Sequence, residues 1–247
     1  MSHPDSQPTP AALTLRELYV DSLSSVPEPL APAMALALAG SFGSEARWRD
    51  EFTAMGKALG GGSGWVLLTF QPRDGTLVNQ CAADHTRTIA SGVPILALDM
   101  HERADHLDHG ANAGAHVDPF MAHIAWAKVY ARYQHAVHAA SVGLALADAS
   151  PAAVQQRLVL DVRRQAMYAQ GTTTLPGAQW RDPAKVAEWA ADLPPNCDVL
   201  VYCVYGHEVC RATALKLRAL GVRANFLPGG IDAWASAGKP LQPKESA

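Results

Sequence analysis

One stretch near the carboxyl end, from Asp198 to Leu220, constrains the fold of this 247-residue chain more than any other. It begins with Asp198-Val199-Leu200-Val201-Tyr202, a short β-branched apolar run that is typical of a buried parallel strand. It ends with Arg211 to Leu220, where apolar residues recur at helical spacing. Between the two lies the segment from Cys203 to Cys210. The pattern predicts a strand, a loop and a helix, with a cysteine at the strand's end.

Cys203 stands where the predicted strand gives way to the loop that leads into the helix. Loop amides and the positive end of a helix stabilise an anion at such a position, which lowers the pKa of a thiol and favours the thiolate. The alternative is a buried structural cysteine, because free cysteines are usually core residues. Position alone leaves both interpretations open.

Further motifs flank this loop on both sides. Upstream, Leu158 to Arg164 predicts a strand that ends in an acidic and a basic residue, and Leu175 to Ala178 predicts a turn. Downstream, Phe226 to Trp234 contains the pattern Gly-Gly-Ile-x-x-Trp. In this order, with Cys203 between them, the motifs resemble the rhodanese domain over about residues 151 to 242.

The resemblance implies a sulfurtransferase in which Cys203 carries a persulfide. It also implies that the backbone amides of residues 204 to 209 surround that sulfur. The residues expected to contact the substrate are Val204, Tyr205, Gly206, His207, Glu208, Val209, Asp161 and Arg163.

The loop departs from the family pattern at two positions. Thiosulfate-using rhodaneses usually have arginine five residues after the cysteine, followed by serine or threonine, where this chain has Glu208 and Val209. A carboxylate there repels a sulfonate, so thiosulfate is not the expected donor. His207 either tunes the ionisation of the sulfur or points to solvent. Cys210 either resolves a persulfide or sulfenate as a disulfide with Cys203, or only packs.

The composition narrows the function classes. A hydrophobic fraction of 49% with 17% charged residues is that of an ordinary globular protein with a sizeable core. The net charge of -3 favours neither nucleic acid nor an anionic membrane as a partner. Four cysteines without paired spacing favour a reducing compartment, and residues 1 to 10 lack the pattern of a secretory leader. We therefore expect a soluble, cytoplasmic protein whose partners are a small-molecule sulfur donor and a thiol acceptor.

The first half of the chain mixes helical and strand patterns. Trp65 to Phe70 and Thr76 to Asn79 predict a hairpin around the turn Pro72-Arg73-Asp74-Gly75. Val93 to Leu98 predicts a third strand, and Pro119 to Tyr133 predicts one long helix.

A second resemblance covers this half, from about residue 13 to residue 138. Its motifs are Phe42-Gly43-Ser44, Gly62-Ser63-Gly64-Trp65, Pro94-Ile95-Leu96-Ala97-Leu98-Asp99, Trp126 and Arg132-Tyr133. In one register they resemble the C-terminal α/β domain of iron/manganese superoxide dismutases. Those enzymes hold one metal ion with three histidines and one aspartate, and Asp99 matches the aspartate.

The other metal ligands of that family are not matched. Arg103 and Arg16 stand at two of the histidine positions, and the third histidine belongs to a first helix that this sequence does not predict. A guanidinium cannot donate a lone pair to a metal. We therefore expect no cofactor and no superoxide dismutase activity, with the two arginines neutralising Asp99. The domain would serve as a scaffold or homodimerisation unit, in which Glu102 and Arg103 pair across the two-fold interface.

A cluster of histidines permits a different interpretation of this region. His101, His106 and His109 lie close together in sequence, and with Asp99 they could form a replacement site for zinc, nickel or copper. The alternative is a solvated histidine-rich surface that binds metal only adventitiously.

The sequence thus predicts an α/β protein of two domains. Residues 1–12 are expected to be disordered, and residues 13–138 form an α+β superoxide-dismutase-like domain of helices and a three-stranded sheet. A linker follows over 139–153, and residues 154–242 form an α/β rhodanese-like domain with a parallel sheet. Two other functions remain open, an iron- or manganese-dependent superoxide dismutase with an accessory rhodanese domain, and a non-catalytic binding scaffold.

Overall fold

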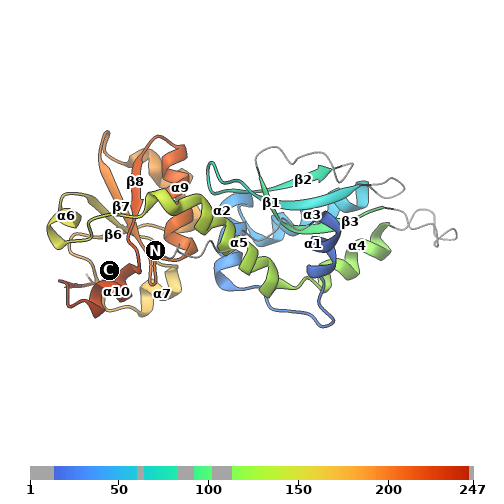
Figure 1. Cartoon of the computed structure of the whole chain (residues 1–247), viewed down its shortest axis with the longest axis horizontal. Coiled ribbons are helices and arrows are strands. Elements are labelled where there is room, and N and C mark those ends of the chain that lie inside the picture. The colour runs from blue at the N-terminus through green and yellow to red at the C-terminus, as the bar shows by residue number, and fades with distance from the viewer. Residues whose placement is uncertain (1–13, 60–63, 83–91, 102–112, 245–247) are drawn as a thin grey trace, which may run out of the picture.

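The computed structural model of the chain describes residues 14–59, 64–82, 92–101 and 113–244. They form two α/β halves that lie side by side along the long axis of the molecule (Figure 1). Residues 1–13, for most of which we predict disorder, lie outside the described part of the chain. No helix within the described ranges is both long and apolar enough to cross a membrane.

The N-terminal half packs helices against an antiparallel sheet. Its helices are α1 (Leu15–Asp21), α2 (Pro32–Phe42), α3 (Glu45–Ala58), α4 (Ala113–Ala122) and α5 (Trp126–Ser141), and its strands are β1 (Trp65–Phe70), β2 (Leu77–Ala82) and β3 (Val93–Asp99). The strand order is β2-β1-β3, and all six residues of the central strand β1 are buried. The predicted three-stranded sheet is confirmed.

The predicted hairpin is also confirmed, as β1 and β2. Gly75 adopts a φ of 71°, a left-handed conformation that costs little for a residue without Cβ. Its amide donates to the carbonyl oxygen of Gln71 (2.8 Å), while the carboxylate of Asp74 accepts from the amide of Thr76 (3.0 Å). The turn therefore closes through the proline-, aspartate- and glycine-rich segment that predicted it.

The prediction of a single long helix over Pro119 to Tyr133 is wrong, because the helix is interrupted between the end of α4 and the start of α5. The break forms because this backbone pairs with the segment after α1 instead of continuing the helix. The amide of Ser24 donates to the carbonyl of His123 (2.8 Å), and the amide of Ala125 donates to the carbonyl of Ser22 (2.8 Å). These bonds satisfy groups that the helix would otherwise pair internally.

The C-terminal half is built on a parallel sheet. Its elements are α6 (Pro151–Gln155), β4 (Leu158–Asp161), α7 (Gln165–Gln170), β5 (Thr173–Thr174), β6 (Gln179–Trp180), α8 (Val186–Trp189), β7 (Asp198–Tyr202), α9 (Glu208–Ala219), β8 (Arg223–Phe226), α10 (Gly230–Ser236) and β9 (Gln242–Pro243), with short 3-10 turns η1 (Val142–Leu144), η2 (Pro183–Lys185) and η3 (Ala190–Asp192). The four main strands run in the order β6-β4-β7-β8, and each neighbouring pair is parallel. The predicted parallel sheet is confirmed, with β7 inside it.

The segment 139–153, which we predict to be a linker, has regular structure. Helix α5 continues to Ser141, and η1 follows directly. The amide of Leu146 then donates to the carbonyl of Phe226 at the end of β8 (2.9 Å), and the Leu146 side chain is buried. This segment is therefore attached to the C-terminal sheet before α6 begins.

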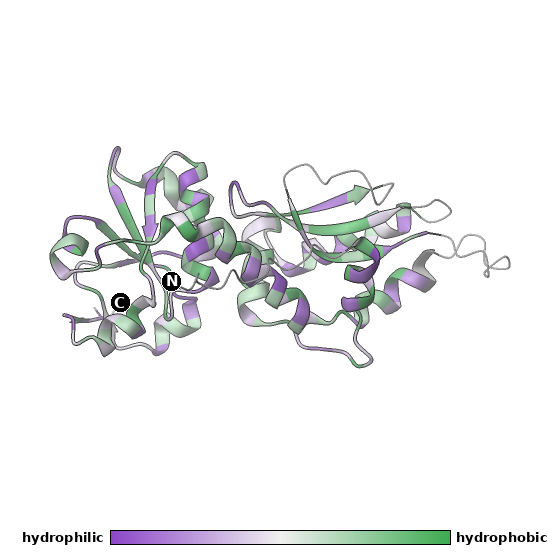
Figure 2. Ribbon diagram, in the orientation of Figure 1, coloured by the Kyte–Doolittle hydropathy of each residue, from purple (hydrophilic) through white to green (hydrophobic). Residues whose placement is uncertain are grey.

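The hydrophobic cores of the two halves meet at α9. Hydrophobic residues are concentrated in the strands of both sheets, and the helices alternate between polar and apolar residues (Figure 2). Ala212 and Leu215 of α9 are buried in the core of the N-terminal half, whereas Ala214 and Leu217 are buried in the core under the parallel sheet. Helices α2 and α5 lie on the side of the N-terminal half that faces the C-terminal half, and both pack against α9 (Figure 1).

Candidate active site, a cysteine loop between strand and helix

Cys203 directly follows β7, which lies between β4 and β8 in the parallel sheet. The loop runs from Cys203 to His207, and α9 begins at Glu208. In open parallel sheets this carboxyl end of the strands is where ligands bind. The Cys203 side chain is 6% exposed, so it is shielded from bulk water.

Two glycines allow the cysteine loop to pack directly on the turn that starts α10. Gly206 has a φ of 71°, and a Cβ there would lie 2.4 Å from the amide nitrogen of Gly229. Gly230 has a φ of 60°, and a Cβ there would lie 2.5 Å from the carbonyl oxygen of Cys203. The amide of Ile231 donates to that same carbonyl (3.0 Å). The Gly-Gly-Ile pattern of the sequence thus anchors the backbone of the cysteine.

Donors directed at the Cys203 sulfur lower its pKa to about 7. The largest contribution is a hydrogen bond from the Cys210 thiol, and the backbone amides of Cys210, Gly206 and His207 add to it. Burial acts in the opposite direction but is outweighed. At neutral pH a large fraction of Cys203 is therefore thiolate, the form that acts as a nucleophile.

Cys210 lies in the first turn of α9 and is fully buried. Its Sγ lies 3.2 Å from the Sγ of Cys203 and 3.5 Å from the carbonyl oxygen of His207. Burial raises the pKa of Cys210 well above its usual range, and the neighbouring Cys203 raises it further. Of the two sulfurs, Cys203 carries the charge and Cys210 keeps the proton.

Glu208, expected to contact the substrate, is turned towards the N-terminal half. One carboxylate oxygen accepts from the hydroxyl of Tyr130 (2.7 Å), and the other accepts from the side-chain amide of Gln134 (3.1 Å), both on α5. Glu208 is 8% exposed, and burial together with this hydrogen bond raises the pKa of Tyr130. The carboxylate is therefore bound to α5 at the start of α9.

Arg211 ties the same loop to the end of α5. Its Nε donates to the carbonyl oxygen of Gly206 (2.9 Å), and its Nη1 donates to the hydroxyl of Ser141 (3.2 Å). Its guanidinium also lies over the ring of Phe226, 4.2 Å from the centroid. Three contacts in different directions fix this side chain, and through it the backbone of the loop.

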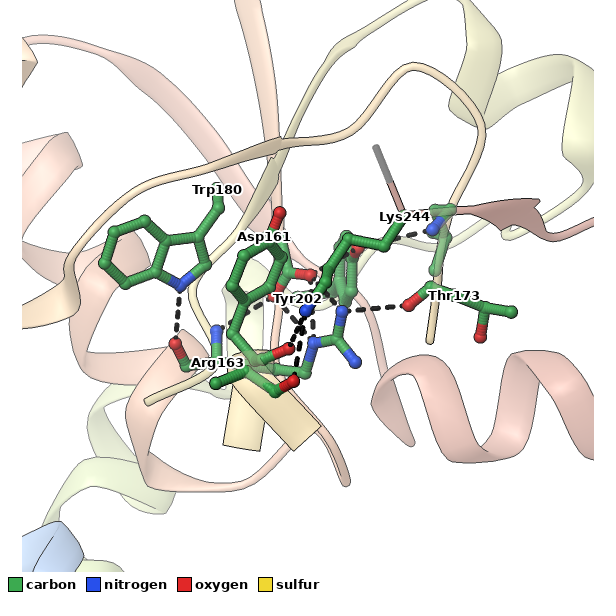
Figure 3. Close-up of polar contacts among 9 residues, drawn as sticks. Asp161, Arg163, Thr173, Trp180, Tyr202 and Lys244 are labelled. Atoms are coloured by element: carbon green, nitrogen blue, oxygen red, sulfur yellow. Dashed lines mark hydrogen bonds and ion pairs between the residues drawn. The ribbon is translucent and has the colours of Figure 1, made fainter. Parts of the chain in front are cut away.

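Asp161 and Arg163, also expected to contact the substrate, form a buried network with each other (Figure 3). Arg163 Nη2 lies 2.6 Å from a carboxylate oxygen of Asp161 and also donates to the carbonyl of Thr173 (3.0 Å). The hydroxyl of Tyr202 donates to the same carboxylate (2.9 Å). Arg163 is 5% exposed and Asp161 is fully buried. Since breaking one partner of such a pair leaves an unpaired buried charge, we interpret this network as a support for the strand ends.

The remaining loop side chains face outward to different degrees. Tyr205 is 55% exposed, and its ring lies 5.8 Å from that of His207, which is also exposed. Val204 and Val209 are half-buried. Tyr205 and His207 are thus the loop side chains that an incoming molecule meets first.

Tyr130 and Gln134 are site residues that sequence reasoning missed. They are spaced four apart on α5, so they share a helix face, but nothing local indicates that this face meets Glu208. Arg211 is adjacent to Cys210 in sequence, and a basic residue so close to the loop is a local signal of a contact with its backbone.

Comparison with known families accounts for both halves. Residues 30–132 match the family described as iron/manganese superoxide dismutases, C-terminal domain, and residues 145–237 match the rhodanese-like domain. The chain joins a superoxide-dismutase-like domain to a rhodanese-like domain. Both resemblances that the sequence motifs indicated are confirmed.

Curated relatives match about half of the chain or less. An iron superoxide dismutase of Cupriavidus metallidurans is 55% identical over 126 residues, which are 51% of this chain and 64% of that protein. A manganese superoxide dismutase of Halobacterium salinarum is 38% identical over 106 residues, 42% of this chain and 52% of that protein. The chain thus spans between about half and two-thirds of the length of these relatives.

The described residues of the superoxide-dismutase-like domain do not fit the family's metal. Asp99 Oδ1 lies 2.6 Å from Nδ1 of His101 and accepts a hydrogen bond from the backbone amide of His101 (3.0 Å). The backbone carbonyl oxygen of Asp99 lies 2.8 Å from Nε2 of His116. Within the ranges that the structure describes, no three His, Cys, Asp or Glu side chains cluster closely enough to hold a metal ion. A site of three histidines and one aspartate is not assembled from these residues.

The expected neutralisation of Asp99 by Arg16 is not observed. Arg16 is exposed on α1, and Asp99 is not fully buried, since 20% of its side chain is exposed. The imidazole of His101 lies next to this carboxylate instead, with Nδ1 2.6 Å from Oδ1. Glu102, Arg103, His106 and His109, on which the predicted dimer contact and the replacement metal site depend, lie outside the described residues.

Proposed function

We propose that this chain is a rhodanese-type sulfurtransferase that carries sulfur as a persulfide on Cys203. The observation that supports it most directly is the position of Cys203 at the end of β7, where donors of the loop and the start of α9 converge on its sulfur and lower its pKa to about 7. A thiolate of this kind attacks the sulfane sulfur of a donor. The bond to that sulfur breaks, and the remainder of the donor leaves as an anion. The loop amides that stabilise the thiolate also suit the negative charge of a persulfide.

The preferred donor in this proposal is a low-molecular-weight persulfide rather than thiosulfate. Binding a sulfonate calls for a cation in the loop, and the position used for it in thiosulfate-specific relatives holds Glu208. Arg211, the cation next to the loop, is already engaged by Gly206, Ser141 and the Phe226 ring. A small thiol is the proposed acceptor, approaching past Tyr205 and His207.

The superoxide-dismutase-like domain acts in this proposal as a scaffold and homodimerisation unit. Its helix α5 holds Glu208 through Tyr130 and Gln134, so it supports the loop directly. The relatives are named as iron or manganese superoxide dismutases, but Arg16 and Arg103 stand at two of that family's histidine ligand positions, which argues against that activity here. Metal analysis of purified protein should give far less than one iron or manganese per chain, and a near-stoichiometric content would overturn this assignment.

Intact mass after incubation with a donor tests the sulfur-carrying role. The protein is incubated with an alkyl persulfide and separately with thiosulfate, alongside the variants Cys203→Ser and Cys197→Ser. We expect sulfur to be taken from the persulfide far more readily than from thiosulfate, seen either as added mass on the protein or as sulfide that the protein releases, and this uptake to be lost in Cys203→Ser. The Cys197→Ser control, whose change lies before β7, should behave as the wild type. No uptake from either donor would favour a binding scaffold instead.

A further inference from the structure

Cys210 is a nucleophilic group that sulfur transfer by Cys203 does not require. An apolar side chain would fill the same position in the core, yet the thiol is placed with its Sγ 3.2 Å from the Cys203 Sγ. A disulfide joins two sulfurs about 2.05 Å apart, so a small movement would bring this pair into bonding distance. The loop that connects Cys203 to α9 is anchored by the amide of Ile231 at Cys203 and by Arg211 at Gly206.

We infer that Cys210 discharges the sulfur carried by Cys203 as hydrogen sulfide, by forming a Cys203–Cys210 disulfide. This inference rests on the proposed persulfide function of Cys203. It adds a second activity at the same loop, the reduction of sulfane sulfur to sulfide.

Sulfur is loaded onto Cys203 in one step and released as sulfide in a second. First, the Cys203 thiolate attacks the sulfane sulfur of a persulfide donor, the donor's S–S bond breaks, and the donor leaves as a thiol while Cys203 becomes a persulfide. Second, the Cys210 sulfur, having lost its proton, attacks the Sγ of Cys203. The bond between that Sγ and the outer sulfur breaks, and hydrosulfide leaves and takes up the proton that Cys210 released. The outer sulfur is reduced to sulfide, and the thiol of Cys210 is oxidised to the disulfide.

The geometry favours attack on the inner sulfur. Cys210 contacts the Sγ of Cys203 itself, and that atom becomes the inner sulfur of the persulfide. The departing hydrosulfide leaves from a loop whose Gly206 and His207 amides already stabilise negative charge on sulfur. The cycle is completed when two equivalents of a small thiol reduce the disulfide and are themselves oxidised to their disulfide.

The two steps differ in their dependence on pH. With a pKa of about 7, Cys203 is already substantially ionised at neutral pH, so loading with sulfur proceeds there. Cys210 is buried and its pKa is raised, so its attack is the slower step and accelerates as the pH rises further. The groups that face this sulfur pair are the backbone amides of Cys203, Gly206, His207 and Cys210 and the carbonyl of His207. The charged side chain that acts on Cys210 is Arg211, which lowers the pKa of Cys210 but is outweighed by burial.

Sulfide release measured together with intact mass tests the inference. Reduced full-length protein is given an alkyl persulfide without other thiols, and the variants Cys210→Ser, Cys210→Ala and Cys203→Ser are treated in parallel. We expect the wild type to release one sulfide per chain and to lose two hydrogen atoms in mass. Both Cys210 variants should instead gain one sulfur atom and release no more sulfide than Cys203→Ser.

Peptide mapping locates the disulfide. Cleavage after Glu208 separates the peptide that carries Cys203 from the one that carries Cys210, so a bond between them appears as a linked pair. Cys197 lies on the first of these peptides, and the matched Cys197→Ser variant should leave the linked pair intact.

The possible outcomes separate failure of this inference from failure of the proposed sulfur-carrying function of Cys203. If wild type and Cys210 variants all keep the added sulfur and release equally little sulfide, the inference is overturned and sulfur carriage by Cys203 stands. If no variant and no wild-type protein takes up sulfur, the persulfide function fails, and sulfide release by this route fails with it. Treatment of the wild type with diamide, a thiol oxidant, checks the geometry separately, because a lack of a Cys203–Cys210 bond would also overturn the inference.

Discussion

Cys203 and Cys210 lie on the same loop and helix start, yet the pKa values of their thiols move in opposite directions. Both are buried, which raises the pKa of each, but the Cys210 thiol and three backbone amides donate to Cys203, whereas Cys210 receives one backbone amide, that of Cys203. A single donated thiol proton and three amides thus decide which sulfur is charged. The distinction between carrier and resolving cysteine is therefore set by donor direction, since the two have similar exposure.

The pH dependence of alkylation follows from this arrangement. Because the thiolate reacts with iodoacetamide, the alkylation rate of Cys203 should rise with pH through a midpoint of about 7 and level off once the thiol is fully ionised. In Cys210→Ala the largest donor is removed, so the midpoint should move upward towards the ordinary range of a cysteine. Quantifying alkylated Cys203 by peptide mass spectrometry over a pH series measures both midpoints.

The control for this experiment is Cys197→Ser, which leaves the donors to Cys203 in place. Its midpoint should equal that of the wild type. A wild-type midpoint in the ordinary range of cysteine, or an unchanged midpoint in Cys210→Ala, would contradict the assignment of Cys210 as the main donor.

At the scale of elements, α5 of the superoxide-dismutase-like domain determines how α9 begins. Glu208 is the first residue of α9, where a negative charge is favoured by the free amides of the helix start. Its two oxygens are both occupied by α5, from Tyr130 and Gln134. The amide groups that reach Cys203 belong to His207, directly before this anchor, and to Cys210, two residues after it.

Removing the hydroxyl of Tyr130 should weaken this anchor. Tyr130→Phe leaves one oxygen of a buried carboxylate without its partner, and hydrogen bonds to charged groups contribute about 1.5–3 kcal/mol. We expect lower stability in urea unfolding and a higher alkylation midpoint for Cys203, because the flanking amides are held less firmly. The midpoint separates a positioning role for Tyr130 from a purely structural one.

Tyr205→Phe makes the same chemical change on an exposed tyrosine of the loop. It should alter neither stability nor the alkylation midpoint. An unchanged midpoint in Tyr130→Phe, with stability lowered, would assign Tyr130 to packing between the domains and not to the loop.

Local patterns predicted the elements that depend on neighbouring residues. The β-branched run before Cys203 became β7, and the Gly-Gly-Ile pattern became the turn that binds the Cys203 carbonyl. The break after α4 was not predictable in this way, because it depends on pairing with Ser22 and Ser24, about a hundred residues earlier. The contact between Glu208 and Tyr130 could not be predicted from local patterns either, because the two residues are 78 apart in sequence.

At the scale of the whole molecule, α9 belongs to both hydrophobic cores. Leu215 is buried among residues of the superoxide-dismutase-like domain, and Leu217 is buried under the parallel sheet of the rhodanese-like domain. Domains joined by a small polar interface often unfold separately, whereas a shared apolar helix couples their stabilities. We therefore expect the two domains to unfold in one cooperative transition.

The pair Leu215→Ala and Leu217→Ala tests this coupling, because the two changes are chemically identical and lie on opposite faces of one helix. Each should lower the free energy of unfolding by about 2–5 kcal/mol, and Tm should fall by roughly 2–4 °C for each kcal/mol. Hydrogen exchange of the β1 and β7 amides in denaturant reports the two sheets separately. If the domains are coupled, either variant lowers the protection of both strands together. If Leu215→Ala weakens β1 alone and Leu217→Ala weakens β7 alone, the domains are independent. In that case the superoxide-dismutase-like domain would not act as the scaffold of the cysteine loop, and the effect of Tyr130 on Cys203 would also be lost.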